Sequence, residues 1–274
     1  MLITHETPLD MMYTIQQYTD YDYCLVHLLE KSEEYVEYFV NAKNSGRLII
    51  MDCSLYELGT SFDPKKYAQW IEKINPTEYI VPDVWQNYEE NIKSYKSFAS
   101  EYKNLPGKKL GVLQGKTTEE LINAYQFMNN EADKICVSFG YNYYSNLFNK
   151  HIPIKYAESD LNVKFNPLSF SCGRIFLINF LLSIGILNKN KPHHLLGCGS
   201  PLEFCNYVNY DFITSADTSH PVLMGLENKK YTDLNMDFYK PSFKIDDIFF
   251  NETGETESFN VIDNVIYFKK FLCK

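Results

Sequence analysis

The sequence predicts an α/β fold, and within that class a (β/α)8 TIM-like barrel in which parallel strands alternate with helices. Two observations lead to this prediction. Short runs of β-branched and aliphatic residues recur along the chain, and each run is followed by a polar, amphipathic stretch. The 274 residues also contain no repeat, low-complexity tract or obvious linker, and this length is common for a barrel of one domain. We therefore expect a single barrel domain over residues 1–274.

Seven strands are visible as nearly continuous apolar runs, the pattern expected where helices cover both faces of a parallel sheet. The runs are Tyr23–Leu28, Arg47–Asp52, Glu78–Pro82, Lys109–Gln114, Lys134–Ser138, His193–Gly197 and Asp211–Ala216. Helices are expected between them, for example over Pro64–Ile74, Asn87–Tyr102 and Thr118–Asn129. Asp63 directly before Pro64 is a typical helix start, because the side chain can cap the helix and proline fits its first turn.

An eighth strand is not visible, and we expect it within Lys244–Phe250 or Val261–Phe268. A doubly wound open sheet is the alternative fold, since closure cannot be read from a strand count alone. No glycine-rich phosphate loop follows any strand, which disfavours the nucleotide-binding version of that alternative.

The interval between the fifth and sixth visible strands is long for one crossover. It predicts an irregular insertion around Tyr144–Asn166 and then a buried helix over Ser169–Leu187. The apolar run Ile175–Leu187 inside that helix is shorter than the roughly 20 residues that a membrane span needs. The first ten residues are mixed in charge and poor in apolar side chains, unlike a signal peptide. We therefore expect a cytoplasmic protein that does not enter a membrane.

Charge and cysteine content narrow the possible functions. The 26 basic and 35 acidic residues give a net charge of −9, and Arg47 and Arg174 are the only arginines. Nucleic-acid-binding surfaces are normally basic, so a polynucleotide partner must be held weakly or by a local lysine patch. The seven cysteines show no CxxC or other zinc-ligand spacing, which predicts a reducing compartment, no metal and no cofactor. Abundant Lys, Asn, Ile and Tyr with little Arg are typical of an AT-rich genome, such as that of a phage.

Polar residues follow the strands at the end where barrel enzymes carry their active sites. They are Asp52 after the second strand, Asp83 after the third, Gln114 at the end of the fourth, Gly197 and Gly199 after the sixth, and Asp217 after the seventh. An aspartate after a strand is also a common helix cap, and glycines can serve a tight turn alone. We interpret His193 and His194, at the start of a strand, as structural, and His220 as either a turn or a site residue.

These segments resemble the tRNA-guanine transglycosylases, and especially their shorter relatives in phage and bacterial DNA-modification systems. Four segments carry the resemblance in the family's order: Leu48–Gly59, Val81–Trp85, Leu110–Gly115, and His194–Pro201 leading into Phe212–Pro221. The most specific is the last pair, in which an LLGCGSP segment is followed by an Asp-x-x-x-Pro turn.

The resemblance implies a role for each matching residue. Asp217 inherits the role of nucleophile and Asp52 that of the acid–base aspartate. Asp83 and Gln114 are implied to read the edge of a guanine-like base. The turn Ser138-Phe139-Gly140 is implied to contact the same base through its backbone, and Gly197 and Gly199 belong to the substrate-binding LLGCGSP segment.

The sequence departs from the family pattern in three places. Cys53, Ser54 and Leu55 replace the glycines that follow the first aspartate, and Val222 replaces an arginine after the nucleophile. The C-terminal Cys/His zinc cluster is missing, so no zinc subdomain is expected. These departures favour DNA over tRNA as the polynucleotide.

The chemistry of base exchange requires these residue types. Breaking an N-glycosidic bond builds positive charge on the sugar, which a carboxylate can stabilise and then trap covalently at C1′. A second acid protonates the departing purine and deprotonates the incoming one. An amide and a further carboxylate can pair with the edge of the base, and Trp85, Phe139 or Tyr141 could stack on it.

We therefore expect a transglycosylase that replaces guanine in a polynucleotide with a 7-deazaguanine through a covalent aspartyl–sugar intermediate. One alternative is a hydrolase of a nucleoside or modified base on the same barrel, with water in place of the second base. Another is a non-catalytic barrel that binds nucleic acid or a base. The sequence leaves open whether a homodimer or a partner subunit supplies nucleic-acid contacts.

Overall fold

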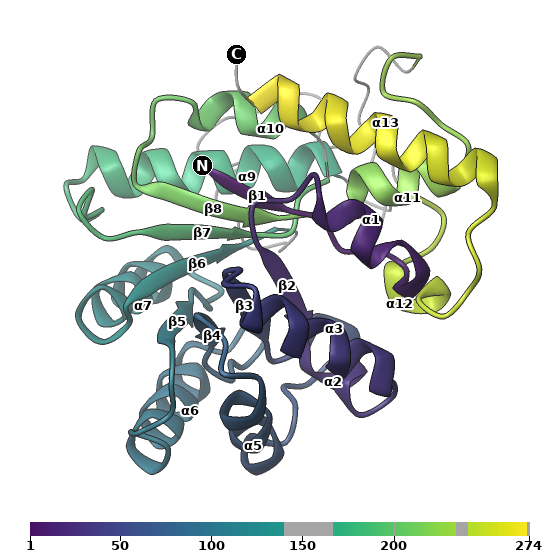
Figure 1. The fold of residues 1–274 in the computed structure, drawn as a ribbon. Helices are drawn as coiled ribbons and strands as arrows, with labels where there is room; N and C mark the ends of the chain where they lie inside the picture. Colours follow the sequence, from purple (N-terminus) through teal and green to yellow (C-terminus); the bar gives the residue numbers. More distant parts are fainter. Residues whose placement is uncertain (140–166, 200, 234–240, 273–274) are drawn as a thin grey trace.

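Eight parallel strands form one sheet that nearly closes into a barrel in the computed structural model (Figure 1). The structure describes residues 1–139, 167–199, 201–233 and 241–272. The strands are β1 (Leu2–Thr4), β2 (Asp22–Leu25), β3 (Ile49–Asp52), β4 (Glu78–Ile80), β5 (Lys108–Val112), β6 (Lys134–Ser138), β7 (His193–Leu196) and β8 (Ile213–Asp217). Their order, β1-β8-β7-β6-β5-β4-β3-β2, confirms the predicted barrel and excludes the doubly wound alternative.

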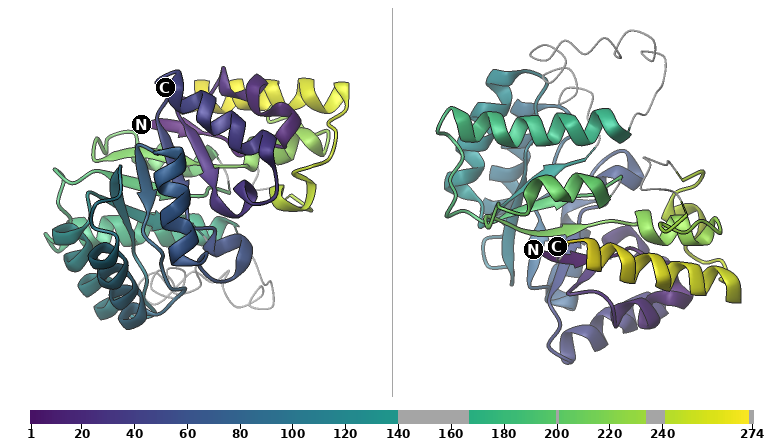
Figure 2. Two further views of the ribbon diagram at one scale, coloured as in Figure 1. Left: turned by 60° about the horizontal axis from the view of Figure 1, so that its bottom comes forward. Right: turned by 90° about the horizontal axis from the view of Figure 1, so that it is seen from above.

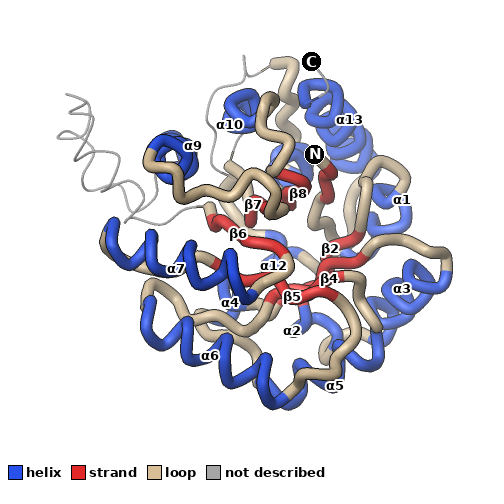
Figure 3. The backbone as a smooth tube through the Cα atoms, turned by 90° about the vertical axis from the view of Figure 1, so that its left-hand side faces the viewer, coloured by secondary structure: helices blue, strands red, loops and turns tan. Residues whose placement is uncertain are grey.

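Helices surround this sheet, as the view along the strands in Figure 3 shows. They are α1 (Met12–Gln16), α2 (Val26–Leu29), α3 (Glu33–Asn44), α4 (Leu55–Leu58), α5 (Pro64–Ile74), α6 (Tyr88–Glu101), α7 (Thr118–Glu131), α9 (Pro167–Ser183), α10 (Pro201–Phe204), α11 (His220–Leu226), α12 (Ile245–Ile248) and α13 (Glu255–Leu272), with 3-10 turns η1 (Leu9–Met11) and η2 (Cys205–Tyr207). The predicted insertion around residues 144–166 lies outside the described residues. Within the described ranges, no helix combines the length and hydropathy of a membrane span.

Local sequence explains where several helices begin. The Asp63 side chain accepts a hydrogen bond from the Lys66 backbone N–H, and Pro64 occupies the first turn of α5, as predicted. Thr117 caps α7 in the same way through the Glu120 N–H. The first predicted strand is shorter than expected, because Val26–Leu29 forms the short helix α2.

The eighth strand was predicted in the wrong place. It is β1, at the N-terminus, which pairs with β8, whereas the two predicted segments contain α12 and α13. Val261, Val265 and Phe268 are buried on one side of α13, and their spacing of four and three residues is that of a helix face. A strand of three residues carries too little periodicity to be recognised, so its pairing partner decides its structure.

The seam of the barrel lies between β1 and β2, which form no ladder with each other. Asp20 spans this seam, because its backbone N–H donates to the Ile3 carbonyl and its carboxylate accepts from the Ile3 N–H, both at 2.9 Å. In Figure 2, α13 lies beside α11 and close to the N-terminal strand.

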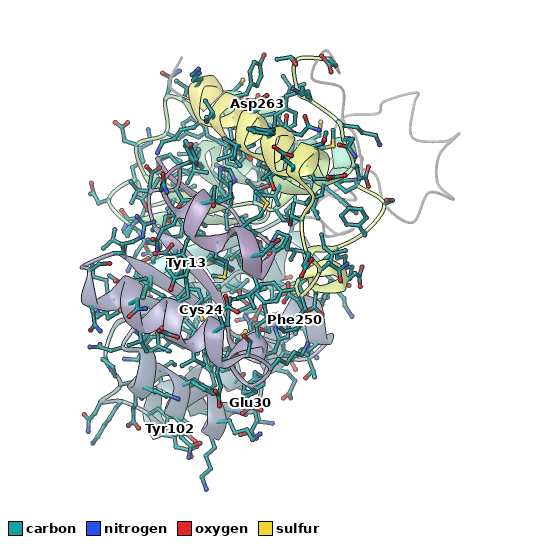
Figure 4. All side chains as sticks on the ribbon, turned by 45° about the vertical axis from the view of Figure 1, so that its right-hand side comes forward. Tyr13, Cys24, Glu30, Tyr102, Phe250 and Asp263 are labelled. Carbon is teal, nitrogen blue, oxygen red and sulfur yellow. The ribbon has the colours of Figure 1, made fainter. Side chains whose placement is uncertain are left out.

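The interior is filled by apolar side chains from the strands and from the inner faces of the helices. Figure 4 shows Cys24 of β2 inside the molecule, whereas Glu30 and Asp263 lie at its periphery. All five residues of β6 and all four of β2 are buried. This burial agrees with the apolar runs from which the strands were predicted.

Arg174 of α9 ties the ends of two strands together. It is completely buried and forms an ion pair with Glu203 at 2.6 Å. Its remaining N–H groups donate to the carbonyl oxygens of Val137, Leu196 and Gly197 at 2.9–3.1 Å. The arginine therefore fixes the backbone where β6 and β7 reach the C-terminal end of the barrel.

Replacing this arginine should destabilise the fold. We expect Arg174→Met to lower the free energy of unfolding by about 3–5 kcal/mol, because Glu203 would remain buried without an opposite charge beside it. The double variant R174M/E203L should recover part of this loss, since it removes both charges. Urea unfolding measures each value, with Lys93→Met on the exposed face of α6 as the control. Equal loss in the single and double variants would contradict this explanation.

Candidate active site

A cavity of about 520 Å³ opens at the C-terminal ends of the strands. This is the size of a pocket for a small organic ligand. Seven acidic side chains line it: Glu6, Asp52, Glu57, Asp83, Asp217, Asp246 and Asp247. Among the described residues that line it, Lys244 is the only lysine or arginine.

Most of the predicted site residues meet at this cavity. The cavity is lined by the predicted site residues Asp52, Asp83, Ser138, Gly197, Gly199 and Asp217. It is also lined by Trp85 and Phe139, two of the predicted stacking residues. Gly140 and Tyr141 lie outside the described residues. Gln114 does not line the cavity and is completely buried.

Gln114 instead lies behind Asp83. Its Nε2 donates to the Asp83 carboxylate at 2.7 Å, and its Oε1 accepts from the Gln86 backbone N–H at 2.9 Å. The Cys53 thiol donates to the other Asp83 oxygen at 3.3 Å. Burial raises the pKa of Asp83 to about 6. Gln114 and Cys53 therefore fix the carboxylate that faces the ligand space.

Asp217 stands at the end of β8 with both carboxylate oxygens paired. One oxygen is 3.0 Å from His194 Nε2, and the other accepts from the Gly197 N–H at 3.0 Å. Gly197 adopts a φ of 65°, a left-handed conformation that glycine reaches without strain. The two bonds hold the carboxylate in one orientation at the cavity wall.

A chain of hydrogen bonds determines the tautomer of His194. Lys134 Nζ, which is paired with Glu78, can only donate, and it donates to Ser215 Oγ at 3.3 Å. The Ser215 hydroxyl then has its proton available for His194 Nδ1 at 2.9 Å. In the arrangement where Ser215 donates to Nδ1, His194 Nε2 carries the N–H that points at Asp217.

His194 was interpreted from the sequence as structural only, but its side chain contacts the site residue Asp217. Successive residues of a strand point to opposite sides of the sheet, so His193 points outward to Tyr125 and His194 points into the barrel. His194 also stacks on the Tyr23 ring, with centroids 6.1 Å apart. The alternation of side chains along β7 was the signal that could have separated the two histidines.

Asp52 lies across the cavity at the end of β3. The Tyr23 hydroxyl donates to one oxygen at 2.7 Å, and the Ser54 N–H donates to the other. Burial is the largest cause that raises the pKa of Asp52 to about 7, and these two hydrogen bonds limit the rise. A carboxyl group with this pKa can both donate and accept a proton near neutral pH.

Ser54 occupies the position where the resemblance led to an expectation of glycine. Its φ is 59°, in the left-handed region that favours glycine. Its hydroxyl bonds to His27 Nδ1 at 2.8 Å, and His27 Nε2 bonds to Asp246 of α12 at 2.8 Å. These contacts connect the loop after β3 to the C-terminal wall of the cavity and compensate for the backbone strain.

Four acidic residues of the cavity were missed from the sequence: Glu6, Glu57, Asp246 and Asp247. Glu57 follows Asp52 by five residues; burial raises its pKa to about 8, and its Oε2 is buried with no hydrogen-bond partner within the described part of the chain. Glu6 follows β1, so it could not be placed without that strand. Within the residues that the structure describes, no three His, Cys, Asp or Glu side chains are arranged to hold a metal ion.

Aromatic side chains form one rim of the cavity. Tyr56 and Trp85 stack with ring centroids 6.0 Å apart, and Lys244 Nζ lies 4.6 Å from the centroid of Tyr56. Tyr56 is exposed on its outer side. Flat apolar rings beside carboxylates suit a heterocycle with polar edges.

The buried acids should make the protein less stable as pH rises. Unfolded carboxyl groups ionise near pH 4, whereas Asp52 and Glu57 in the folded protein keep their protons to pH of about 7 and 8. The folded state therefore holds more protons between these limits, and the free energy of unfolding falls as pH rises through them. We expect Tm to decline from pH of about 5 to about 9, and to decline less in Glu57→Gln. Thermal unfolding across this range checks it, with Glu90→Gln on the exposed face of α6 as the control.

Neither a scan of protein-family models nor a search of curated proteins finds a match to this chain. The fold itself does not define an activity, because TIM-like barrels carry many chemistries on the same scaffold. The cavity itself indicates which chemistry is possible. Its wall combines Asp217, which has two hydrogen bonds, Asp52, which has a pKa of about 7, and the aromatic rim.

Proposed function

We propose that the protein is a base-exchange transglycosylase that acts on guanine in a polynucleotide. The observation that carries the proposal is the contrast between two carboxyl groups on the same cavity. Asp217 has both carboxylate oxygens bonded, one to His194 and one to the Gly197 N–H, whereas burial raises the pKa of Asp52 to about 7. A carboxylate held in one orientation and a second carboxyl group that can exchange a proton near neutral pH are what a nucleophile and acid–base pair requires.

The proposed reaction proceeds in two displacements. In the first, Asp217 forms a bond to C1′ of the sugar while the bond from C1′ to the guanine nitrogen breaks, and Asp52 gives its proton to the departing base. In the second, Asp52 takes a proton from the incoming 7-deazaguanine, whose nitrogen attacks C1′ and releases Asp217 as a carboxylate. Asp52 ends with the proton that it began with, so the cycle is balanced.

Base recognition is proposed for Asp83. Its carboxylate accepts only, so it suits the donor edge of a guanine-like base. Gln114 supports this role by holding one Asp83 oxygen, at 2.7 Å, and leaving the other side of the carboxylate toward the cavity. The contribution of Gln114 to base selection is therefore exerted through Asp83.

The proposed polynucleotide is DNA, because the chain lacks the Cys/His zinc pattern that the resemblance associates with tRNA enzymes. A hydrolase of a free nucleoside is the second candidate. The acidic wall of the cavity and the net charge of −9 favour it, since a nucleoside carries no phosphates to be repelled. Water would then take the place of the incoming base in the second displacement.

Labelled guanine separates these candidates. The protein is incubated with radiolabelled guanine and, in parallel, with double-stranded DNA, single-stranded DNA, tRNA or guanosine. Transglycosylation predicts label in one polynucleotide, and hydrolysis predicts free guanine released from guanosine with no label incorporated. If no reaction incorporates label or releases guanine, the remaining possibility is a barrel that binds a base without turnover. That outcome contradicts the proposal.

Asp217→Asn should abolish exchange. The amide keeps the size of the side chain and its contacts with the Gly197 N–H, but it is a far weaker nucleophile. We expect exchange to fall at least about a thousandfold, as for other enzymes that lose their nucleophile, with Tm changed by only a few degrees. Denaturing gels should show a protein–polynucleotide adduct in the wild type and none in the variant. Exchange by Asp217→Asn at a rate near that of the wild type would exclude this mechanism.

A further inference from the structure

Glu6 lies beside the proposed nucleophile because of how the barrel closes. β1 pairs with β8 in a register that sets Thr4 opposite Asp217. The Thr218 N–H continues this contact by donating to the Thr4 carbonyl at 3.2 Å, and His5 Nδ1 bonds to the Thr218 carbonyl at 3.2 Å. The chain that leaves β1 therefore follows Asp217 to the cavity, where Glu6 forms part of the wall.

Glu6 and Asp217 line the same cavity, and a hydrogen bond to Asp217 is among the causes that raise the pKa of Glu6. Two carboxyl groups can share one only if one of them carries a proton, because an ionised carboxylate has no hydrogen to donate. Asp217 already accepts from His194 and from the Gly197 N–H, which stabilise its charge. Glu6 is consequently the partner that holds the proton.

The surroundings of Glu6 support this assignment. Its burial is the largest cause that raises its pKa, and the charges of Asp217 on β8, Glu57 on α4 and Asp52 on β3 raise it further. The tyrosines that face it, on β2, α3 and α4, are themselves shifted toward their neutral forms by burial: Tyr23, Tyr35 and Tyr56. Among the described residues that line the cavity, the only lysine or arginine is Lys244, whose Nζ lies over the Tyr56 ring.

We propose that Glu6 is a positioning residue for Asp217, a neutral carboxylic acid that donates a hydrogen bond to the nucleophilic carboxylate. This inference rests on the proposed transglycosylase function. It adds a third donor to the two that orient Asp217. One proton shared by the pair avoids two adjacent negative charges.

The proton of Glu6 stays in place during the reaction and acts on the second displacement. When Asp217 is bonded to C1′, the Glu6 O–H can donate to the ester oxygen. As the C1′–O bond breaks and the incoming base bonds to C1′, this donor stabilises the carboxylate that departs. Without the donor, Asp217 would be a poorer leaving group, and the glycosyl–enzyme ester would persist.

Two substitutions of Glu6 distinguish a donor from a charge. Glu6→Gln retains an N–H donor of similar size, whereas Glu6→Leu removes the hydrogen bond. We expect E6Q to exchange at least about ten times faster than E6L at neutral pH, the effect of one hydrogen bond to a charged group. E6L should accumulate the denaturing-gel adduct, and E6Q should lose less activity than the wild type as pH rises, since its amide cannot ionise. Equal inactivity of two folded variants would overturn the proposal, because an ionised Glu6 would then be required.

A second measurement does not depend on activity. The wild-type folded state holds a proton on Glu6 that the unfolded chain releases above pH of about 4.5, so the stabilising effect of this proton is lost as pH rises. The Tm of E6Q relative to the wild type should therefore increase from pH of about 5 to about 9, and the infrared C=O band of protonated carboxyl groups should weaken in E6Q. Glu90→Gln serves as the control.

The two proposals fail in different ways. A Tm difference that does not change with pH, together with an unchanged infrared band, would show that Glu6 is ionised and would overturn the inference. Absence of exchange in the wild type, with both signatures present, would overturn the transglycosylase function and leave the proton-sharing pair intact.

Discussion

A continuous chain of hydrogen bonds inside the barrel determines how Asp217 is presented. It begins at the buried Lys134, passes through Ser215 and His194, and ends on the carboxylate. Each buried polar group in the chain needs a partner, because an unpaired one costs about 1–3 kcal/mol. The lysine donates to Ser215, and where the Ser215 hydroxyl donates in turn to His194 Nδ1, the Nε2–H of His194 points at Asp217. The interior of the barrel thus orients a side chain that reaches the solvent-facing cavity.

The carboxyl groups that gather at the cavity raise the free-energy cost of each negative charge there. Burial raises the pKa values of Glu6, Asp52, Glu57 and Asp83, and repulsion from neighbouring carboxylates raises those of the first three further, whereas Asp217 is supplied with donors. The protons are therefore divided unevenly among neighbouring carboxyl groups. An uneven division is useful for catalysis, since one group can remain a nucleophile while another exchanges a proton. It also lowers stability at alkaline pH, as is common for functional sites.

The supports of the cavity come from distant parts of the chain. Arg174 and Glu203 fix the loop that contains Gly197, and His27 with Asp246 connects the loop after β3 to α12. Both are buried or half-buried polar contacts that require matched geometry. The acidic wall is consequently supported from behind by residues of other elements, and Asp246 belongs both to the wall and to this support.

The sequence by itself determined the class of fold and the positions of three aspartates of the site. Apolar runs alternating with amphipathic segments are a local signal, so seven of the eight strands and the long helices α5, α6, α7 and α9 could be recognised. Asp52, Asp83 and Asp217 could be assigned to the same end of the barrel, because the carboxyl ends of parallel strands meet there. Their grouping around one cavity followed from these positions alone.

Only the tertiary structure decided the partners of those residues. The three residues of β1 form a strand because they pair with β8, more than 200 positions away, and this pairing brings Glu6 to Asp217. His194 and Gln114 depend on which way a side chain points once the barrel has closed: one reaches Asp217 and the other stands behind Asp83. Local sequence encodes strand and helix periodicity, whereas side-chain contacts and proton affinities depend on burial among neighbours that folding brings together.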